Sequence, residues 1–250
     1  MKIGIAGYGF VGKAHELILK DYHDIIISDP AQGHYGNLSH ADAIIICVST
    51  PGSENGYCDV TNVGDVIAEG PDVPYLIKST MSIEGWKLIK DCCKNQNVCF
   101  SPEFLRAAHW ETDARLQDHI YLGGGDTGYW ADLFVNVLGS IDVSIADPKE
   151  LIAAKQLRNS FLALKVTYFN QVFDFCKAQG IDFESVRKVI TDDHRINASH
   201  SHVTDKRGYG GHCFPKDTLA TLRSAQVAGG RITLLEEANE YNSNLRKDQT

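Results

Sequence analysis

The sequence is short of proline, methionine and long apolar runs: its 250 residues include seven prolines and two methionines. The longest apolar stretches, such as AIIICV at 43–48, have the length of a strand and fall far short of a membrane span. Met1 and Lys2 lead straight into IGIAG, without the architecture of a signal peptide, so we expect a cytoplasmic protein. The hydrophobic content of 43% excludes a disordered chain and indicates a globular one.

Basic residues are in the minority, with 24 Lys and Arg against 32 Asp and Glu and a net charge of −8. A nucleic-acid partner needs a broad basic surface that displaces counterions, so this composition disfavours one. An anionic ligand could therefore bind only where basic side chains are grouped locally.

The seven cysteines include no CxxC pair, and Cys92 and Cys93 are adjacent. An odd count with this spacing fits neither a disulfide framework nor a zinc ribbon, so we expect reduced thiols. The HSH segment at 200–202 is the one pair with a spacing that a metal site could use, and we interpret it as a solvated loop. We therefore predict no metal.

Short apolar segments alternate with helical patterns as far as residue 146, which predicts a Rossmann-type, doubly wound parallel sheet. The segments interpreted as strands are 2–6, 24–28, 43–48, 75–79, 97–101, 119–123 and 142–146. We predict that residues 1–146 form the dinucleotide-binding domain.

A long helix is predicted to begin at ADPKE. Asp147 is a suitable N-cap, Pro148 suits the first helical position, and Glu150 stands where a capping box places its acid. Nothing breaks the helix before Gly180, and it is apolar on more than one face. We therefore predict that residues 147–250 form an all-helical domain that also makes a homodimer.

The segment KIGIAGYGFVG gives a strand followed by Gly7-x-Gly9-x-x-Gly12 at the start of a helix. These glycines allow a tight turn and a close approach of the backbone to a pyrophosphate. The next strand ends at Asp29, about where an acid holds the adenosine ribose hydroxyls and repels a 2′-phosphate. The pattern favours NAD over NADP; a glycine-rich turn without a ligand is the alternative.

Lys155 and Asn159 are four residues apart on the long helix and project from the same face. A lysine beside an amide can hold an alcohol oxygen and stabilise it as it becomes an alkoxide. The alternative is a surface lysine next to a structural asparagine.

Cys213 lies in GYGGHCFPKD, where Pro215 suits the first turn of a helix. A helix N-terminus and the nearby Lys216 favour the thiolate form, and Asp217 follows four residues later on the same face. A nucleophile is the favoured interpretation. A buried structural thiol and a metal ligand are the alternatives.

Six motifs together resemble those of the UDP-glucose/GDP-mannose dehydrogenase family, in the family's order and from residue 1 to about 245. They are GYGFVG, VSTP (48–51), KST (78–80), SPEFLR (101–106), KQLRNSFLALKVTYFN (155–170) and GYGGHCFPKD.

The resemblance implies oxidation of a nucleotide sugar's C6 alcohol to a carboxylate, a reaction of polysaccharide biosynthesis, with two NAD reduced in succession. It gives Cys213 the role of a nucleophile that forms a thiohemiacetal and then a thioester. Lys155 and Asn159 would stabilise oxyanions. Glu103 would act as a general base, and Thr80 and Asp217 would position a water molecule. CFPKDT is most similar to the branch that converts UDP-glucose to UDP-glucuronate.

The family's binding residues carry over by motif. The expected NAD contacts are Gly7, Tyr8, Gly9, Phe10, Val11, Gly12, Asp29, Thr50 and Lys216. The expected substrate contacts are Phe104, Leu105, Arg106, Tyr209, Gly210 and Gly211, with Arg195 reaching the substrate across a dimer.

The sequence departs from the family pattern at three places. Ala107 and Ile152 stand where the family has acids, although Glu150 lies close to the second. Family members also carry a C-terminal α/β domain that completes the nucleotide site, and this chain ends at EEANEYNSNLRKDQT. Two alternatives therefore stay open: a non-catalytic NAD or sugar-nucleotide binding module, and a single-step dehydrogenase of the β-hydroxyacid type, which needs no thiol.

Overall fold

The computed structural model describes residues 1–53, 55–93, 97–211 and 213–247. Its strands are β1 (Lys2–Ala6), β2 (Asp24–Asp29), β3 (His34–Tyr35), β4 (Ala43–Ile46), β5 (Tyr75–Ile77), β6 (Val98–Phe100), β7 (His119–Gly124) and β8 (Asp142–Ile145). Its α-helices are α1 (Phe10–Leu19), α2 (Thr61–Glu69), α3 (Ile83–Cys92), α4 (Trp110–Arg115), α5 (Thr127–Leu138), α6 (Pro148–Gln179), α7 (Phe183–Thr191), α8 (Cys213–Val227) and α9 (Thr233–Lys247). The predicted order, a Rossmann-type α/β sheet followed by helices, is confirmed.

The strands form one sheet in the order β3-β2-β1-β4-β5-β6-β7-β8. The prediction of a parallel sheet is correct for β2, β1, β4, β5 and β6, and for β8 beside β7, but wrong at β7, which is antiparallel to β6. The short β3, which was not predicted, is antiparallel to β2. A parallel partner needs a crossover that returns the chain to the other end of the sheet. Between β6 and β7 the only α-helix is the short α4, and it packs on α1 rather than forming such a crossover.

Four parallel strands end level with one another. Ala6 pairs with Ile46, Ile46 with Ile77, and Ile77 with Phe100, and each of these is the last residue of its strand. The loops that follow β1, β4, β5 and β6 therefore leave the sheet at the same edge. In open α/β sheets this is the edge at which ligands bind.

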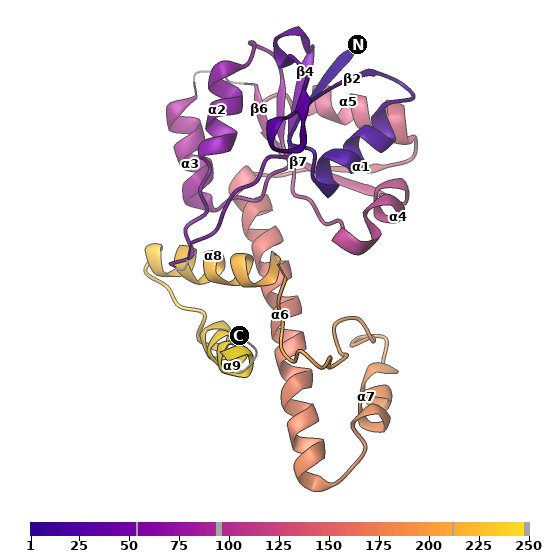
Figure 1. Ribbon diagram of the computed structural model, residues 1–250, viewed down its shortest axis with the longest axis vertical. Helices are drawn as coiled ribbons and strands as arrows, with labels where there is room; N and C mark the ends of the chain where they lie inside the picture. Colours follow the sequence, from indigo (N-terminus) through magenta and orange to yellow (C-terminus); the bar gives the residue numbers. More distant parts are fainter. Residues whose placement is uncertain (54, 94–96, 212, 248–250) are drawn as a thin grey trace. The chain divides into compact units, whose positions relative to one another are not determined.

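Helices cover both faces of the sheet (Figure 1). One face packs against α2 and α3 through residues such as Val63 and Trp86, and the other against α1 and α5 through Leu19 and Phe134. The central strands are buried on both sides, which explains why AIII in β4 is uniformly apolar. Burial also explains why the apolar Ile152 stands where an acid was expected. Ile152 is 1% exposed in the core between the sheet and the helices α2 and α3.

The predicted capping box of the long helix is confirmed. The Lys149 amide donates to Asp147 Oδ1 at 2.8 Å, and the Asp147 amide donates to Glu150 Oε2 at 3.2 Å. At the other end Gly180 has φ +65°, and Ile181 N donates to the Cys176 carbonyl at 3.0 Å, which is the bonding of a Schellman cap. Local sequence thus defines both ends of α6.

The chain divides into two compact units. The first comprises 1–52 and 58–155, and the second comprises 53–57 and 156–250. In the second unit Gly56 lies against α8, since a Cβ on it would come within 2.3 Å of the Leu219 carbonyl oxygen. The predicted domain division at 146/147 stays a prediction.

All seven cysteines lie in the described residues and are free thiols. No helix in the described part of the chain is long and apolar enough to cross a membrane.

Candidate active site

The glycine-rich turn between β1 and α1 is tightly packed on one side and open on the other. Gly7 has φ +89°, and a Cβ there would lie 2.6 Å from the Cys47 backbone. A Cβ on Gly12 would lie 2.2 Å from the Gly7 carbonyl oxygen, whereas at Gly9 it would meet no atom within 4 Å. The turn therefore leaves room for a ligand at Gly9, where the first amides of α1 lack side-chain caps.

Asp29 ends β2 beside this turn. The Tyr8 amide donates to Asp29 Oδ2 at 2.7 Å, and Gln32 Nε2 donates to the same oxygen at 2.9 Å. Partial burial raises the pKa of the Asp29 carboxyl, but these and neighbouring backbone hydrogen bonds outweigh burial and hold the pKa below its usual value. The ionised carboxylate can accept hydrogen bonds from vicinal ribose hydroxyls, and its charge disfavours a 2′-phosphate. The residues present thus fit a dinucleotide such as NAD.

The loops after β4 and β5 are joined through Thr80. The buried Thr50 hydroxyl donates to the Thr80 carbonyl oxygen, and Lys155 Nζ donates to the Thr80 hydroxyl at 2.5 Å. Lys155 is 6% exposed, so its ammonium is fixed by a short bond in a largely dry setting. Two of the predicted catalytic residues, Thr80 and Lys155, are thereby brought together.

A buried ion pair joins the loops after β5 and β6. Lys78 Nζ lies 3.3 Å from Glu103 Oε2 and donates to the Ser101 hydroxyl at 3.0 Å, while Glu103 Oε1 accepts the Phe104 amide at 2.8 Å. Burial raises the pKa of the Glu103 carboxyl, but Lys78 and further charges and hydrogen bonds outweigh it, and the net pKa lies below its usual value. Glu103 is therefore ionised at neutral pH.

Two residues of this cluster, Lys78 and His15, were not predicted from the sequence. Lys78 directly follows the apolar strand β5, and a charge at the end of a strand buried on both faces needs a partner, which was the available signal. His15 lies on α1 one turn after Val11, whose carbonyl is 2.9 Å from the His15 Nδ1, and it is 3% exposed. Burial, followed by the charge of Lys78, lowers the pKa of His15 to about 4, so it is neutral at pH 7.

The second unit holds another pair of predicted catalytic residues. Asn159 Nδ2 of α6 donates to Asp217 Oδ2 of α8 at 2.6 Å. Asp217 is 1% exposed, and its Oδ1 has no hydrogen-bond partner among the described residues. A buried carboxylate oxygen of this kind is suited to holding a polar ligand or a water molecule.

Cys213 is the first residue of α8, and its side chain is exposed. Pro215 occupies the first turn, as predicted, and Lys216 is half-buried in the same turn. The sequence places Cys213 and Asp217 one turn apart, but one is exposed and the other buried.

The predicted substrate residues lie in different settings. Tyr209 is buried, Gly211 is exposed, and Gly210 is half-buried. Arg106 forms an ion pair with Asp113, and Arg195 forms one with Asp193, each at 2.5 Å. Phe104 packs on Tyr121, and Leu105 is half-buried. Their contacts with a substrate stay predictions.

Comparisons with known proteins agree with this picture. Residues 150–244 match the UDP-glucose/GDP-mannose dehydrogenase family, central domain. A UDP-glucose 6-dehydrogenase of Rhizobium meliloti (strain 1021) is 26% identical, with 99% of this chain and 68% of the relative covered. One from Rickettsia felis is 32% identical over 74% of this chain and 44% of the relative. The chain spans about half to two thirds of the length of the curated relatives that it matches first.

The fold also has relatives of known structure. A UDP-glucose dehydrogenase from the hyperthermophilic archaeon Pyrobaculum islandicum superimposes with a TM-score of 0.82 over 97% of this chain and 68% of that chain, at 23% identity. This likeness supports the fold.

The Lys78–Glu103 pair predicts an inverted pH dependence of stability in Lys78→Met. In the wild type the pKa of Glu103 is lower in the folded protein than its value of 4.5 in the unfolded chain. The ionised carboxylate therefore stabilises the fold above pH 4.5, and this contribution is lost as the pH falls through the folded-state pKa. Without Lys78 the buried carboxyl has a raised pKa, so the free energy of unfolding should instead fall as the pH rises from about 5 to 8. The loss at neutral pH should be about 3–5 kcal/mol.

Urea denaturation across this pH range measures the effect. The control is Lys78→Met with Glu103→Gln, in which both charges of the pair are absent and the fall in the free energy of unfolding from about pH 5 to 8 should disappear. Parallel pH profiles for the wild type and Lys78→Met would show that the ion pair does not control the ionisation of Glu103.

Proposed function

We propose that this chain, which over residues 150–244 matches the central domain of the UDP-glucose/GDP-mannose dehydrogenase family, oxidises the C6 alcohol of a nucleotide sugar to the carboxylate with NAD. The observation that carries the proposal is the exposed Cys213 at the start of α8, one turn before the buried Asp217 with its unpartnered Oδ1. A thiol is needed only when an aldehyde must be held for a second oxidation. UDP-glucose is the proposed substrate because the similar relatives are named UDP-glucose 6-dehydrogenases.

The cofactor would be held by the turn from Gly7 to Gly12 and by Asp29. The open space at Gly9 and the first amides of α1, including those of Phe10 and Val11, suit the pyrophosphate, and the Asp29 carboxylate suits the ribose. Thr50 and Lys216 are proposed as further contacts. When bound, NAD accepts a hydride in each of two successive oxidations.

Lys155 and Asn159 are proposed to act on the substrate's C6 oxygen. The Lys155 ammonium is already aligned by its bond to Thr80, and Asn159 by its bond to Asp217. Preorganised donors of this kind stabilise negative charge on oxygen because they need no reorientation during the reaction.

Cys213 is proposed to capture the aldehyde. Its Sγ forms a bond to the carbonyl carbon, which gives a thiohemiacetal, and the second oxidation turns this adduct into a thioester. Water then adds to the acyl carbon, the C–S bond breaks, and the thiol and the carboxylate are released. Thr80 and Asp217 would orient the water, and Glu103 would take up its proton.

Seven residues are proposed as contacts of the sugar nucleotide. They are Phe104, Leu105, Arg106, Tyr209, Gly210, Gly211 and Arg195.

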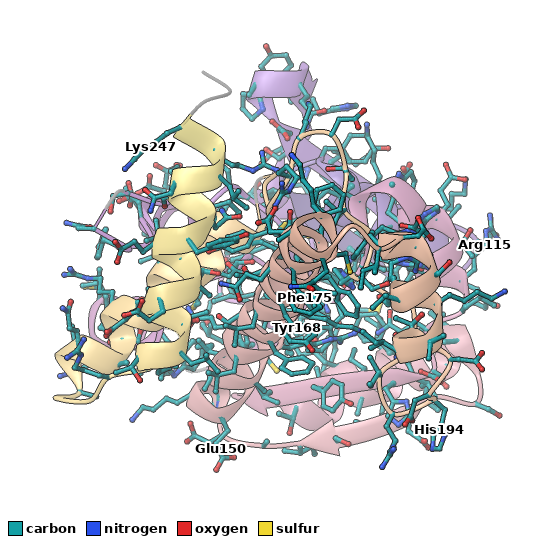
Figure 2. All side chains as sticks on the ribbon, turned by 90° about the horizontal axis from the view of Figure 1, so that it is seen from below. Arg115, Glu150, Tyr168, Phe175, His194 and Lys247 are labelled. Carbon is teal, nitrogen blue, oxygen red and sulfur yellow. The ribbon has the colours of Figure 1, made fainter. Side chains whose placement is uncertain are left out.

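We also propose a homodimer formed through α6. Four large side chains of α6 are between 48% and 64% exposed: Leu157, Phe161, Tyr168 and Phe175. They follow one another at intervals of four and seven residues, which places them on one stripe of the helix. Figure 2 labels two of them, Tyr168 and Phe175. A groove of about 960 Å³ runs beside this stripe between α6, α9 and the 195–199 loop, and Arg195 lines it.

The dimer is tested by Phe161→Glu with Tyr168→Glu. Two charges on the stripe should convert a dimer to a monomer in size-exclusion chromatography with light scattering, because they cannot be desolvated at an apolar interface. Lys177→Glu, at an exposed position of the same helix, is the matched control and should stay dimeric. A wild-type protein that is monomeric at micromolar concentrations would contradict the proposal.

Cys213→Ser tests the role of the thiol. The wild type should form two NADH for each UDP-glucose consumed, and the variant one, because a serine hydroxyl adds poorly to the aldehyde. NADH absorbance with quantification of the sugar product measures this ratio. Full acid formation by the variant would remove Cys213 from the mechanism, one NADH per sugar in the wild type would favour the single-step dehydrogenase, and NAD binding without any turnover would favour the binding module.

Asp29→Ala tests the cofactor site. Loss of hydrogen bonds to a charged acceptor should weaken NAD binding by about 1 to 3 kcal/mol, measured by titration calorimetry. Asp24→Ala, at the exposed opposite end of β2, is the control and should bind NAD as the wild type does. Equal affinity of Asp29→Ala and the wild type would contradict the assignment.

A further inference from the structure

The loop that leads into Cys213 has a backbone that is unfavourable by itself. Arg207, Gly208 and Gly211 have φ values of +48°, +57° and +78°. Glycine adopts this left-handed conformation without a steric penalty, but at Arg207 it is unfavourable and needs support from outside the loop.

Asn242 of α9 provides that support at Tyr209. Its Oδ1 accepts the Tyr209 amide at 2.7 Å, and its Nδ2 donates to the Tyr209 carbonyl at 3.1 Å. Asn242 is 7% exposed and Tyr209 is 3% exposed, so both bonds are protected from water. One buried side chain thus fixes both polar groups of a single backbone residue.

The glycines of the loop fit around α9. A Cβ on Gly208 would lie 2.3 Å from Asn242 Oδ1, and a Cβ on Gly210 would lie 2.5 Å from Arg246 Nη1. Side chains of α9 therefore occupy the space that any larger residue in the loop would need. On the other side, Asn170 Oδ1 of α6 accepts the Gly208 amide at 3.0 Å.

In sequence, Cys213 lies midway between two residues that are each held by the side chain of an asparagine. Tyr209 precedes it by four residues and is held by Asn242, and Asp217 follows it by four residues and is held by Asn159. The thiol itself is exposed, so packing of its own side chain does little to fix its position.

We infer that Asn242 is a positioning residue for Cys213, which acts through the backbone of Tyr209. The inference rests on the proposed function, because Cys213 is the nucleophile only there. Its consequence is specific: without Asn242 cofactor binding persists, and capture of the aldehyde slows more than the first oxidation does.

Asn242→Ala tests the inference, with Asn244→Ala as the matched control at an exposed position of the same helix. A misplacement of about 1 Å can cost roughly 10²-fold in rate, so the second oxidation should slow roughly tenfold to a hundredfold in Asn242→Ala. The ratio of NADH to sugar in early turnover should fall from two towards one, with the KM for NAD unchanged. A general loss of stability would not shift this ratio, and Asn244→Ala should keep it at two.

Iodoacetamide alkylation of Cys213 gives a readout without substrate. Peptide mapping by mass spectrometry distinguishes Cys213 from the other cysteines, and its alkylation rate across pH 6–9 should differ between the wild type and Asn242→Ala but not Asn244→Ala. Should Asn242→Ala not fold, Gly208→Ala displaces the same contact from the loop side.

The outcomes separate this inference from the proposed function. Wild-type turnover with two NADH per sugar, together with an unchanged ratio and alkylation profile in Asn242→Ala, would overturn the inference alone. If the wild type oxidises no nucleotide sugar, the proposed function fails, and the alkylation profiles still decide whether Asn242 positions the thiol.

Discussion

The polar centre of the first unit depends on the ion pair between Lys78 and Glu103. Removing either charge from water costs several kcal/mol, so neither would be stable at its position without the other. Lys78 follows β5 directly and Glu103 comes shortly after β6, and their contact therefore holds these two loops together at the edge of the sheet where four strands end level. Thr80, two residues after Lys78, is placed by the same loop to receive Lys155.

The charges of Glu103 and His15 depend on the balance between burial and neighbouring charges. Glu103 stays ionised because cations and backbone amides outweigh its desolvation, whereas His15, which also senses Lys78, is kept neutral. One arrangement of charges thus keeps Glu103 charged and its neighbour His15 uncharged at neutral pH. A lysine aligned on a threonine hydroxyl and a carboxylate held ionised nearby are the groups that an alcohol oxidation requires.

Sequence predicted those features that depend on local chemistry. The capping box at Asp147 and Glu150, the glycine turn and the end of α6 all involve residues within a few positions of one another, and the structure has them as predicted. The antiparallel β7 was missed because a strand's apolar pattern is the same in either direction, and the direction follows from α4 packing on α1. Lys78 and Asn242 were missed because their partners are distant in sequence, and only the register of the sheet or the path of α9 brings them together. His15 was missed because its burial depends on packing, although its contact with the Val11 carbonyl is local.

Acylation of Cys213 is the central event of the proposed chemistry. The most direct measurement is to mix the protein with NAD and UDP-glucose, quench with acid at successive times, and determine the mass of the Cys213 peptide. A transient increase by the mass of the sugar nucleotide's acyl group, removed by hydroxylamine, is the predicted result. Formation of two NADH per sugar while the Cys213 peptide stays unmodified at every time would contradict it.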